Sequence, residues 1–417
     1  MTNVLYSVLA INLIILIIIA LFVCIYCKRN VSSSGNGFVS VILDTIPSFF
    51  KSNQCSNKVL GSKVCYRISD KLEYRNKSIT TYQCFNDLSS KWSLQMTNNF
   101  NECTILMFES LNNVDELLKV IKFPPCIRYV FGVGGSDMMA SKSALYFVLS
   151  ENSLYNIVPK TYIVENGKDL ELFRKDRSLE YNNTNMYILK KNVQRQEGFL
   201  ITRDVDEVID KFQNPNKGYV VCQELLQNPL VIGGRKINIR IYLLVICTNN
   251  SCCNMYMYDD GFMYYTKKMW VTNSTDPEVN ITTGYIDRSV YVDNPLTFKD
   301  LQTKLNNGTN GTNGENGLGD LLLYNIKLVM TDVARAYSPI ICSQNKNLPG
   351  TKFQIYGVDI APSNDFKVQI MEINKGPDLG YKDERDKALK LGMVDDALSI
   401  VFNENLNVLE SNFIKLV

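Results

Sequence analysis

Two apolar stretches, FQIYGVDI (Phe353–Ile360) and KVQIMEIN (Lys367–Asn374), decide the fold of this chain. The polar segment APSND joins them, and its residue types favour turns, so the pattern predicts a β-hairpin. Asp359 lies on the first strand, whereas Glu372 and Asn374 lie two residues apart on the second and share one face. Two carboxylates and an amide oxygen that converge are hard ligands suited to Mg²⁺. The alternative interpretation is a solvated face of a surface hairpin.

Another strand is predicted for KINIRIYLLV (Lys236–Val245). Because side chains alternate between the faces of a strand, one face carries Lys236, Asn238, Arg240 and Tyr242. A half-exposed antiparallel strand would place these groups in water. The apolar runs around them favour a central strand, where unpaired cations are strongly destabilising and need an anionic partner.

Two further strands end in polar residues. MYILK (Met186–Lys190) ends in a lysine, and a polar loop with one glycine separates it from the next strand, which ends at Ile201. Such a loop can fold over phosphates while the lysine neutralises them, although a surface hairpin is the alternative. YVVCQELL (Tyr219–Leu226) runs into Gln223-Glu224 and can present backbone groups to an adenine edge; the alternative is a core strand that leads to a turn.

The remaining pattern predicts helices and loops around these strands. Helices are expected at 114–121, at 136–149 with Ser136 or Asp137 as N-cap, at 321–337 as a buried helix, and at 388–409 with an interruption at Gly392. A strand is expected at Pro159–Val164, and a mobile, low-complexity loop at 306–320.

Composition limits the chemistry that is open to this chain. The 417 residues are 46% hydrophobic and 11% aromatic, which indicates a globular body. With 44 basic and 42 acidic residues the formal charge is +2, so we predict no nucleic-acid binding. Histidine is absent, which excludes Ser–His and Cys–His catalysis and histidine-ligated metals. Ten of the 12 cysteines follow the apolar N-terminus, and they permit disulfides or buried reduced thiols.

The N-terminal segment LYSVLAINLIILIIIALFVCIYC (Leu5–Cys27) is predicted to be a transmembrane helix. It carries no charge and would span about 34 Å, which exceeds the roughly 30 Å of a hydrocarbon core. Lys28 and Arg29 follow at once, so the positive-inside rule predicts a single-pass protein whose body faces the cytoplasm, at a viral or host endomembrane. Val31–Gly37 is expected to be a flexible tether.

In order and spacing, these segments resemble the tubulin–tyrosine ligase-like family of ATP-grasp enzymes. The resemblance runs from about residue 142 to 401. It comprises Pro159-Lys160-Thr161, the Lys190 strand, Gln223-Glu224 with Asn228-Pro229-Leu230, Lys236-x-Asn238-x-Arg240, Thr272-Asn273, Gly357-Val358-Asp359, and Glu372-x-Asn374-x-x-Pro377. One such match would be weak, but seven in the same order are specific.

The resemblance implies an α+β protein with the ATP-grasp fold of antiparallel sheets and flanking helices, after a smaller α/β N-terminal domain. Together with the predicted membrane helix at 5–27 and a linker at 28–50, we expect an N-terminal domain at 51–145 and a ligase domain at 146–417, with parts 146–218 and 219–417.

The resemblance also implies a role for each site residue. ATP would contact Lys190, Gln223, Glu224, Leu225, Leu226, Lys236, Asn238, Thr272 and Asn273, with residues 223–226 as the adenine hinge. Mg²⁺ would be ligated by Asp359, Glu372 and Asn374. Catalysis would fall to Arg240, Lys190 and Glu372. Family members phosphorylate a protein carboxylate, and an amino acid amine then attacks the acyl phosphate to form an amide.

The chain departs from the family at four positions. Asn238 stands where the family usually has Asp, and Trp270-Val271 stand where it has a histidine before the Thr-Asn pair. Asp260–Tyr265 offers no arginine on the strand near the amino acid site, and Gln196 replaces a glycine. The implied substrates are tyrosine or glutamate and a protein tail such as that of tubulin. A ligase for a different carboxylate, and a degenerate membrane or virion protein without ligase activity, are the alternatives.

Overall fold

The computed structural model describes residues 63–68, 71–72, 80–108, 114–165, 167–179, 185–192, 198–248, 253–307, 317–402 and 411–417. All of them belong to one compact unit, Asn57–Val417. The predicted membrane segment Leu5–Cys27 and most of the loop predicted at 306–320 lie outside the described residues. None of the helices within these ranges combines the length and the hydropathy that crossing a bilayer requires.

Within the described ranges, the larger sheet has 12 strands, with β13-β12-β11-β14-β5-β4-β1-β2 as its main order. Its strands are β1 (Lys63–Ile68), β2 (Lys71–Leu72), β3 (Gln95–Met96), β4 (Ile105–Phe108), β5 (Tyr129–Phe131), β10 (Val231–Ile232), β11 (Arg235–Cys247), β12 (Asn254–Thr266), β13 (Thr282–Thr283), β14 (Thr351–Pro362), β15 (Val368–Asn374) and β16 (Phe413–Lys415).

Strand β11 lies in the middle of this sheet. It pairs antiparallel with β12 on one side and with β14 on the other. Ile237, Ile239 and Ile241 are fully buried on one face, while Lys236 and Arg240 on the other are only 4% and 8% exposed. The prediction of a central strand is therefore confirmed, and the half-exposed alternative is wrong.

Strands β14 and β15 form the hairpin predicted from the sequence. They pair antiparallel, and Asp359 lies directly opposite Glu372. A bulge follows this pair, because the register shifts between Asp359 and Ile360. The strands β5, β4 and β1 continue the sheet from the far side of β14 in parallel pairings, so the N-terminal α/β part shares its sheet with the rest of the unit.

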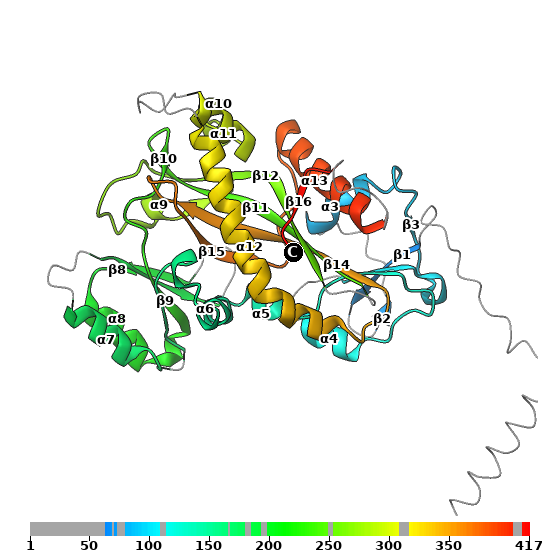
Figure 1. Ribbon diagram of the computed structural model, residues 1–417, viewed down its shortest axis with the longest axis horizontal. Coiled ribbons are helices and arrows are strands. Elements are labelled where there is room, and N and C mark those ends of the chain that lie inside the picture. The colour runs from blue at the N-terminus through cyan, green and yellow to red at the C-terminus, as the bar shows by residue number, and fades with distance from the viewer. Residues whose placement is uncertain are drawn as a thin grey trace, which may run out of the picture. The chain divides into compact units, whose positions relative to one another are not determined.

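A smaller sheet has the order β6-β9-β7-β8, formed by β6 (Thr161–Ile163), β7 (Tyr187–Lys191), β8 (Phe199–Thr202) and β9 (Tyr219–Glu224). Helices α7 (Leu170–Leu179) and α8 (Val205–Gln213) contact β6 and β8, and Figure 1 shows them beside this sheet. Tyr187 and Leu189 are buried in the apolar cluster that includes Phe173 and Phe212 of the two helices, whereas Ile188 is buried in a second cluster with Leu225. Alternation along β7 therefore gives Lys190 the same face as Ile188.

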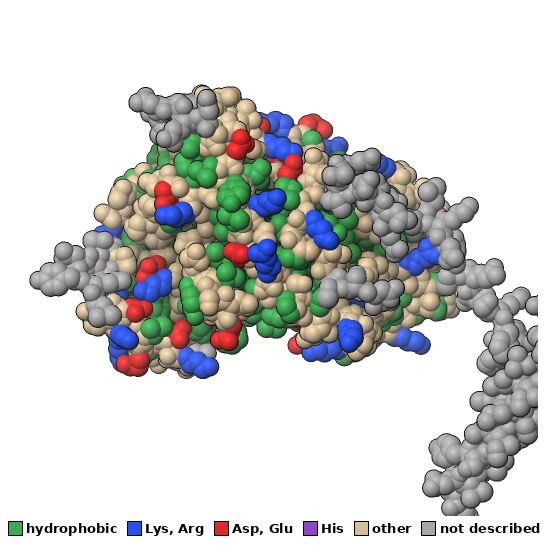
Figure 2. All heavy atoms as spheres, viewed as in Figure 1, with side chains coloured by type: hydrophobic (Ala, Val, Ile, Leu, Met, Phe, Trp, Pro, Cys, Tyr) green, Lys and Arg blue, Asp and Glu red, His purple; other side chains and the backbone are tan. Residues whose placement is uncertain are grey.

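The other helices surround the larger sheet, and Figure 1 shows α12 running across its strands. They are α3 (Thr80–Asp87), α4 (Val114–Val120), α5 (Ser136–Ala140), α6 (Lys142–Glu151), α9 (Pro277–Asn280), α10 (Val290–Asp293), α11 (Phe298–Asn306), α12 (Leu318–Asn345) and α13 (Glu384–Phe402). Figure 2 shows apolar side chains along the outer face of α12, which exposes Leu321, Tyr324 and Leu328. The helix predicted at 321–337 exists, but it is longer and only one of its faces is buried.

Two other helix predictions need correction. The helix predicted at 136–149 is two helices, because Ser141 is extended and its hydroxyl caps α6 by accepting from the backbone of Ala144. The N-cap of α5 is Gly135, with a left-handed φ of 89°, rather than Ser136 or Asp137. Helix α13 continues through Gly392 without interruption.

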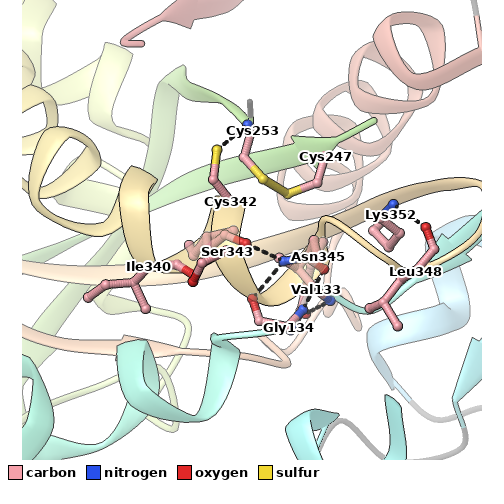
Figure 3. Close-up of a disulfide and its surroundings, with 12 residues drawn as sticks. Val133, Gly134, Cys247, Cys253, Ile340, Cys342, Ser343, Asn345, Leu348 and Lys352 are labelled. Atoms are coloured by element: carbon pink, nitrogen blue, oxygen red, sulfur yellow. Dashed lines mark hydrogen bonds between the residues drawn. A yellow bond between two sulfur atoms is a disulfide. The ribbon is translucent and has the colours of Figure 1, made fainter. Parts of the chain in front are cut away.

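The cysteines adopt both states that the sequence permits. Cys65 bonds to Cys103, and Cys247 bonds to Cys253 across the β11–β12 hairpin (Figure 3). Cys126 is also disulfide-bonded. The free thiols among the described residues are Cys84, Cys222 and Cys342, and the sulfur of Cys342 accepts a hydrogen bond from the backbone of Cys253 at 3.1 Å.

Candidate functional site

Three adjacent strands bring the central charges of the site together. Arg240 on β11 lies opposite Asp359 on β14, and Asp359 lies opposite Glu372 on β15. Residues that face each other across a sheet project to the same side, so the three side chains form one row. The hairpin thus brings Asp359 to the face that the sequence assigned to Glu372 and Asn374.

The guanidinium of Arg240 holds Asp359 with two hydrogen bonds. Its Nε donates to Oδ1 at 2.5 Å and its terminal nitrogen donates to Oδ2 at 2.8 Å. Burial raises the pKa of Asp359 to about 6, although the charge of Arg240 opposes this effect. Gly357 makes the pair possible, because a Cβ there would lie 2.8 Å from Cδ of Arg240.

Asn374 links the two carboxylates. Its amide nitrogen lies 3.4 Å from Oδ2 of Asp359 and 3.2 Å from Oε1 of Glu372. All three predicted metal ligands therefore meet at one point of the β14–β15 hairpin, and the solvated-face alternative fails for Asp359, which is 7% exposed.

Lys142 at the start of α6 is a site residue that the sequence reasoning missed. Its Nζ lies 3.9 Å from Oε2 of Glu372. Burial raises the pKa of Glu372, but Lys142 and Lys190 outweigh burial, so the pKa of this carboxyl is lowered overall. No local sequence pattern identifies Lys142, because its helix is far along the chain from Glu372, the acid that it contacts.

Lys190 and Lys236 approach the site from the two different sheets. Burial lowers the pKa of Lys190 to about 8, against the attraction of Glu372. Burial also lowers the pKa of Lys236 to about 8, and Lys190 adds to this effect. Neither lysine forms an ion pair with another described residue. Two desolvated amines of this kind either lose a proton or gain an anionic partner, so the pair suits an anionic ligand.

Trp270 is a second residue whose position the sequence did not indicate. Its ring lies 5.8 Å from Nζ of Lys236, and its backbone donates to the carbonyl of Gly234 at 2.7 Å. Thr272 and Asn273 are exposed, and the carbonyl of Asn273 accepts from Arg203. The structure therefore connects this loop to the site through Trp270, and it shows no contact of the Thr272 or Asn273 side chains with the charged row.

The predicted adenine hinge lies at the end of β9. Gln223 donates to the hydroxyl of Thr161 at 2.9 Å, while its buried Oε1 has no donor in the described part of the chain. The backbone of Leu225 donates to Met186 at 2.8 Å. Among the described residues, the next amide, that of Leu226, has no acceptor. An orphan acceptor and a free amide beside an apolar cluster fit the edge of an aromatic heterocycle.

Glu224 and Asn238 complete the set of predicted nucleotide residues. Glu224 lies 3.6 Å from Nζ of Lys160, so its carboxylate is an ion-pair partner within the smaller sheet. Asn238 shares the face of Lys236 and Arg240, and its buried Oδ1 has no donor among the described residues.

The residue set fits a magnesium ion that has other ligands besides the protein. No group of three or more Asp, Glu, Cys or His side chains suited to a metal occurs in the described ranges. The site offers two carboxylates and one amide instead. Mg²⁺ commonly takes one or two carboxylates and completes its six ligands with water and substrate phosphates.

Comparison with known proteins identifies the family. The family model described as the tubulin-tyrosine ligase family matches residues 112–408, which is well over half of the chain. The chain belongs to the tubulin-tyrosine ligase family. The mixed α/β, sheet-rich fold is consistent with the ATP-grasp architecture of this family.

Individual members of the family are similar over parts of the chain. A probable tubulin polyglutamylase TTLL9 of Bos taurus is 26% identical over 215 residues, covering 51% of this chain and 44% of the relative. The tubulin polyglutamylase TTLL6 of Homo sapiens is 24% identical over 259 residues, covering 59% and 28%. The probable tubulin polyglutamylase ttll-9 of Caenorhabditis elegans is 24% identical over 267 residues, covering 60% and 59%. The chain thus spans less than two thirds of each of these relatives.

Proposed function

We propose that this chain is an ATP- and Mg²⁺-dependent ligase that joins the amine of an amino acid to a protein carboxylate. The observation that supports this proposal is the row of Arg240, Asp359 and Glu372, with Asn374 between the acids. Lys190 lies near this row and Lys236 lies near Lys190, and neither has an ion-pair partner in the described part of the chain. Phosphoryl transfer from ATP needs several cationic groups and metal ligands together, because negative charge must be neutralised on several phosphate oxygens at once.

The proposed reaction proceeds in two steps. A carboxylate oxygen of the acceptor attacks the γ-phosphorus of ATP, ADP leaves, and an acyl phosphate forms. The amine of the amino acid then attacks the acyl carbon, phosphate leaves, and an amide remains. Bound Mg²⁺ would neutralise charge on the phosphates.

The residues of this chain have separate tasks in that reaction. Lys190 and Lys236 would hold the phosphates, and residues 223–226 would hold the adenine. Asp359, Glu372 and Asn374 would ligate the metal. Arg240 would stabilise the charge that develops on the transferred phosphoryl group.

We propose glutamate as the amino acid and the tail of tubulin as the acceptor, with tyrosine as the second choice of amino acid. Support comes from the names of the similar proteins, which are tubulin polyglutamylases. A different protein carboxylate remains the competing acceptor, because Asp260–Tyr265 lacks the arginine that the family usually carries near the amino acid site.

The test measures ADP release and amide formation by the full chain in detergent. We expect ADP release that requires tubulin, glutamate and Mg²⁺, with glutamate addition visible by mass spectrometry. Glu372→Gln should lower the rate by at least about 10²-fold, since it removes charge at the metal. Glu278→Gln is the matched control, because Glu278 pairs with Lys268 at the surface. An equal loss in both variants would contradict the assigned role of Glu372.

A nucleotide-binding protein without ligase activity is the second candidate. The observation that favours it is Tyr264, whose ring lies 5.0 Å from the Arg240 guanidinium on the strand where the family's arginine is absent. Binding of ATP without ADP release, in the presence of tubulin and either amino acid, would support this candidate over the ligase.

We propose further that Leu5–Cys27 anchors the chain to a bilayer, that residues 28–50 are a linker, and that residues 51–145 and 146–417 are its two domains. The absence of charge and the flanking Lys28-Arg29 support the anchor and a cytoplasmic body. Disulfides are rare in the cytosol, so thiol mapping tests the orientation. Cytoplasmic exposure predicts reduced Cys65 and Cys103 in cells, whereas the disulfide between them in the structure favours an oxidising compartment. An oxidised pair in cells would contradict the cytoplasmic orientation.

A further inference from the structure

The two carboxylates of the candidate metal site already have cationic partners from this chain. Arg240 takes both oxygens of Asp359, at 2.5 and 2.8 Å. Lys142 lies at ion-pair distance from Glu372. A metal ion that binds to either carboxylate must therefore displace a charge that the fold has placed there.

The contact between Arg240 and Asp359 is held from several sides. The Arg240 guanidinium lies over the ring of Tyr264, 5.0 Å from its centroid. On the other side the guanidinium lies against the bare backbone of Gly357, where an added Cβ would lie 2.9 Å from its terminal nitrogen. A two-point, buried, charge-assisted pair with packed surroundings is strong and directional.

Asn374 presents its amide nitrogen to both acids. In this orientation it donates to Asp359 and Glu372 rather than offering an oxygen to a cation. A half-turn of the amide would exchange its nitrogen and oxygen and present the oxygen as a hard ligand to a cation held between the two acids.

The charges around the acids have an excess of cations. Among the described residues, Arg240 pairs with Asp359, Lys142 pairs with Glu372, and the charge of Lys190 acts on both carboxylates, while Lys236 lies next to Lys190. A free divalent cation entering this group adds repulsion at low local dielectric. A polyanionic triphosphate has the opposite effect, because it gives the lysines and the arginine new partners.

We infer that Arg240 and Lys142 act as resident counter-ions that exclude free Mg²⁺, so that the metal enters only together with the nucleotide. The triphosphate draws the two cations from Asp359 and Glu372, and the released carboxylates then take the metal. This inference rests on the proposed function, and it gives Arg240 a positioning role before its role in phosphoryl transfer.

The test uses Mn²⁺ as a paramagnetic probe of the full chain in detergent, without nucleotide. We expect no binding to the wild type at millimolar Mn²⁺. Arg240→Gln and Lys142→Gln should each bind Mn²⁺ at least about tenfold more tightly, because a competing cation is gone. The double variant Arg240→Gln/Glu372→Gln should lose this binding, which would place the ion at the hairpin.

Lys367→Gln is the matched control, because Lys367 pairs with Asp365 on the exposed turn of the same hairpin. It should behave as the wild type. Circular dichroism shows whether Arg240→Gln folds. If this variant does not fold, the Mn²⁺ affinity of Lys142→Gln decides the test. Equal Mn²⁺ affinity of the wild type and the variants would overturn the inference, as would no binding to any of them.

A separate titration of a fluorescent ATP analogue distinguishes failure of this inference from failure of the proposed function. If the wild type binds no analogue at saturating Mg²⁺, the nucleotide site is wrong whatever the Mn²⁺ result. If it binds the analogue and also binds Mn²⁺ alone as tightly as the variants do, only the resident counter-ions are refuted.

Discussion

Gly357 shows how one missing side chain positions the charges of the site. It lies on β14, two residues before Asp359, where a Cβ would lie 2.8 Å from Cδ of Arg240 and 3.0 Å from Cβ of Pro377. The Arg240 side chain therefore lies over β14 at Gly357, the residue of this strand that has no side chain. A glycine here is required by space rather than by backbone conformation.

Gly357→Ala should weaken the fold and the site together. We expect a loss of about 1–3 kcal/mol in the free energy of unfolding, as for other overpacked positions. Thermal and denaturant unfolding measure it. Gly392→Ala on α13 is the control, because the added Cβ meets only the Tyr258 hydroxyl, at 3.6 Å. That variant should be neutral or more stable by up to about 1 kcal/mol; equal destabilisation of both variants would contradict the steric argument.

If Lys236 holds phosphate as proposed, nucleotide affinity should depend on pH. Burial lowers its pKa to about 8, so its charge is mostly present at pH 7 and mostly absent at pH 9. ATP affinity, measured by calorimetry, should therefore fall as pH rises through this range. Lys236→Arg should flatten the dependence, because arginine stays charged. A wild-type affinity that is unchanged between pH 7 and 9 would show that this ammonium does not contact phosphate.

The lowered pKa of Lys236 also affects the free energy of unfolding. This free energy should rise with pH in the range where ATP affinity falls. The unfolded chain binds a proton at Lys236 up to its ordinary pKa of about 10.5, whereas the folded chain releases it near 8. Between these values the unfolded state holds more protons, so this group adds stability as pH rises. A loss of ATP affinity above pH 8 would therefore not come from destabilisation of the fold by this lysine.

At the scale of single elements, the β11–β12 hairpin is closed by a covalent bond. Cys247 and Cys253 lie just beyond the last pair of the ladder, Ile246 and Asn254, with their Cα atoms 4.1 Å apart. Figure 3 shows Cys342 of α12 beside this disulfide. The loop that this bond closes is short, whereas Cys65 and Cys103 are separated by 38 residues.

Removing the two disulfides should cost different amounts. By loop-closure entropy, Cys65→Ser should lose about 4 kcal/mol of stability and Cys247→Ser about 2 kcal/mol. Denaturant unfolding of protein purified under oxidising conditions measures both, and Cys222→Ser tests the removal of a buried free thiol. If Cys247→Ser lost more than Cys65→Ser, loop length would not be the governing term.

At the scale of the whole molecule, the proposed anchor and the described body are expected to act independently. Deletion of residues 1–30 should release the chain from membranes that resist alkaline carbonate, while ATP affinity stays unchanged. Fractionation followed by nucleotide titration measures both properties. A truncated chain that still sediments with membranes would refute Leu5–Cys27 as the sole anchor.

The strand period was sufficient to assign the acids and cations of the larger sheet. Alternation along Lys236–Val245 and Lys367–Asn374 gave the shared faces before any partner was known, because a strand has only two faces. The helices were less well predicted. The break at Ser141 depends on an extended backbone and a side-chain cap, and the start of α5 depends on the left-handed Gly135; neither feature changes the apolar spacing.

By itself, the sequence determined which residues could meet across a hairpin, since neighbours along a strand obey a local geometry. Only the tertiary structure decided that Lys142 reaches Glu372, that Trp270 lies beside Lys236, and that Gly357 admits Arg240. These contacts join segments far apart in the chain, and their geometry comes from sheet register and packing rather than from any local period.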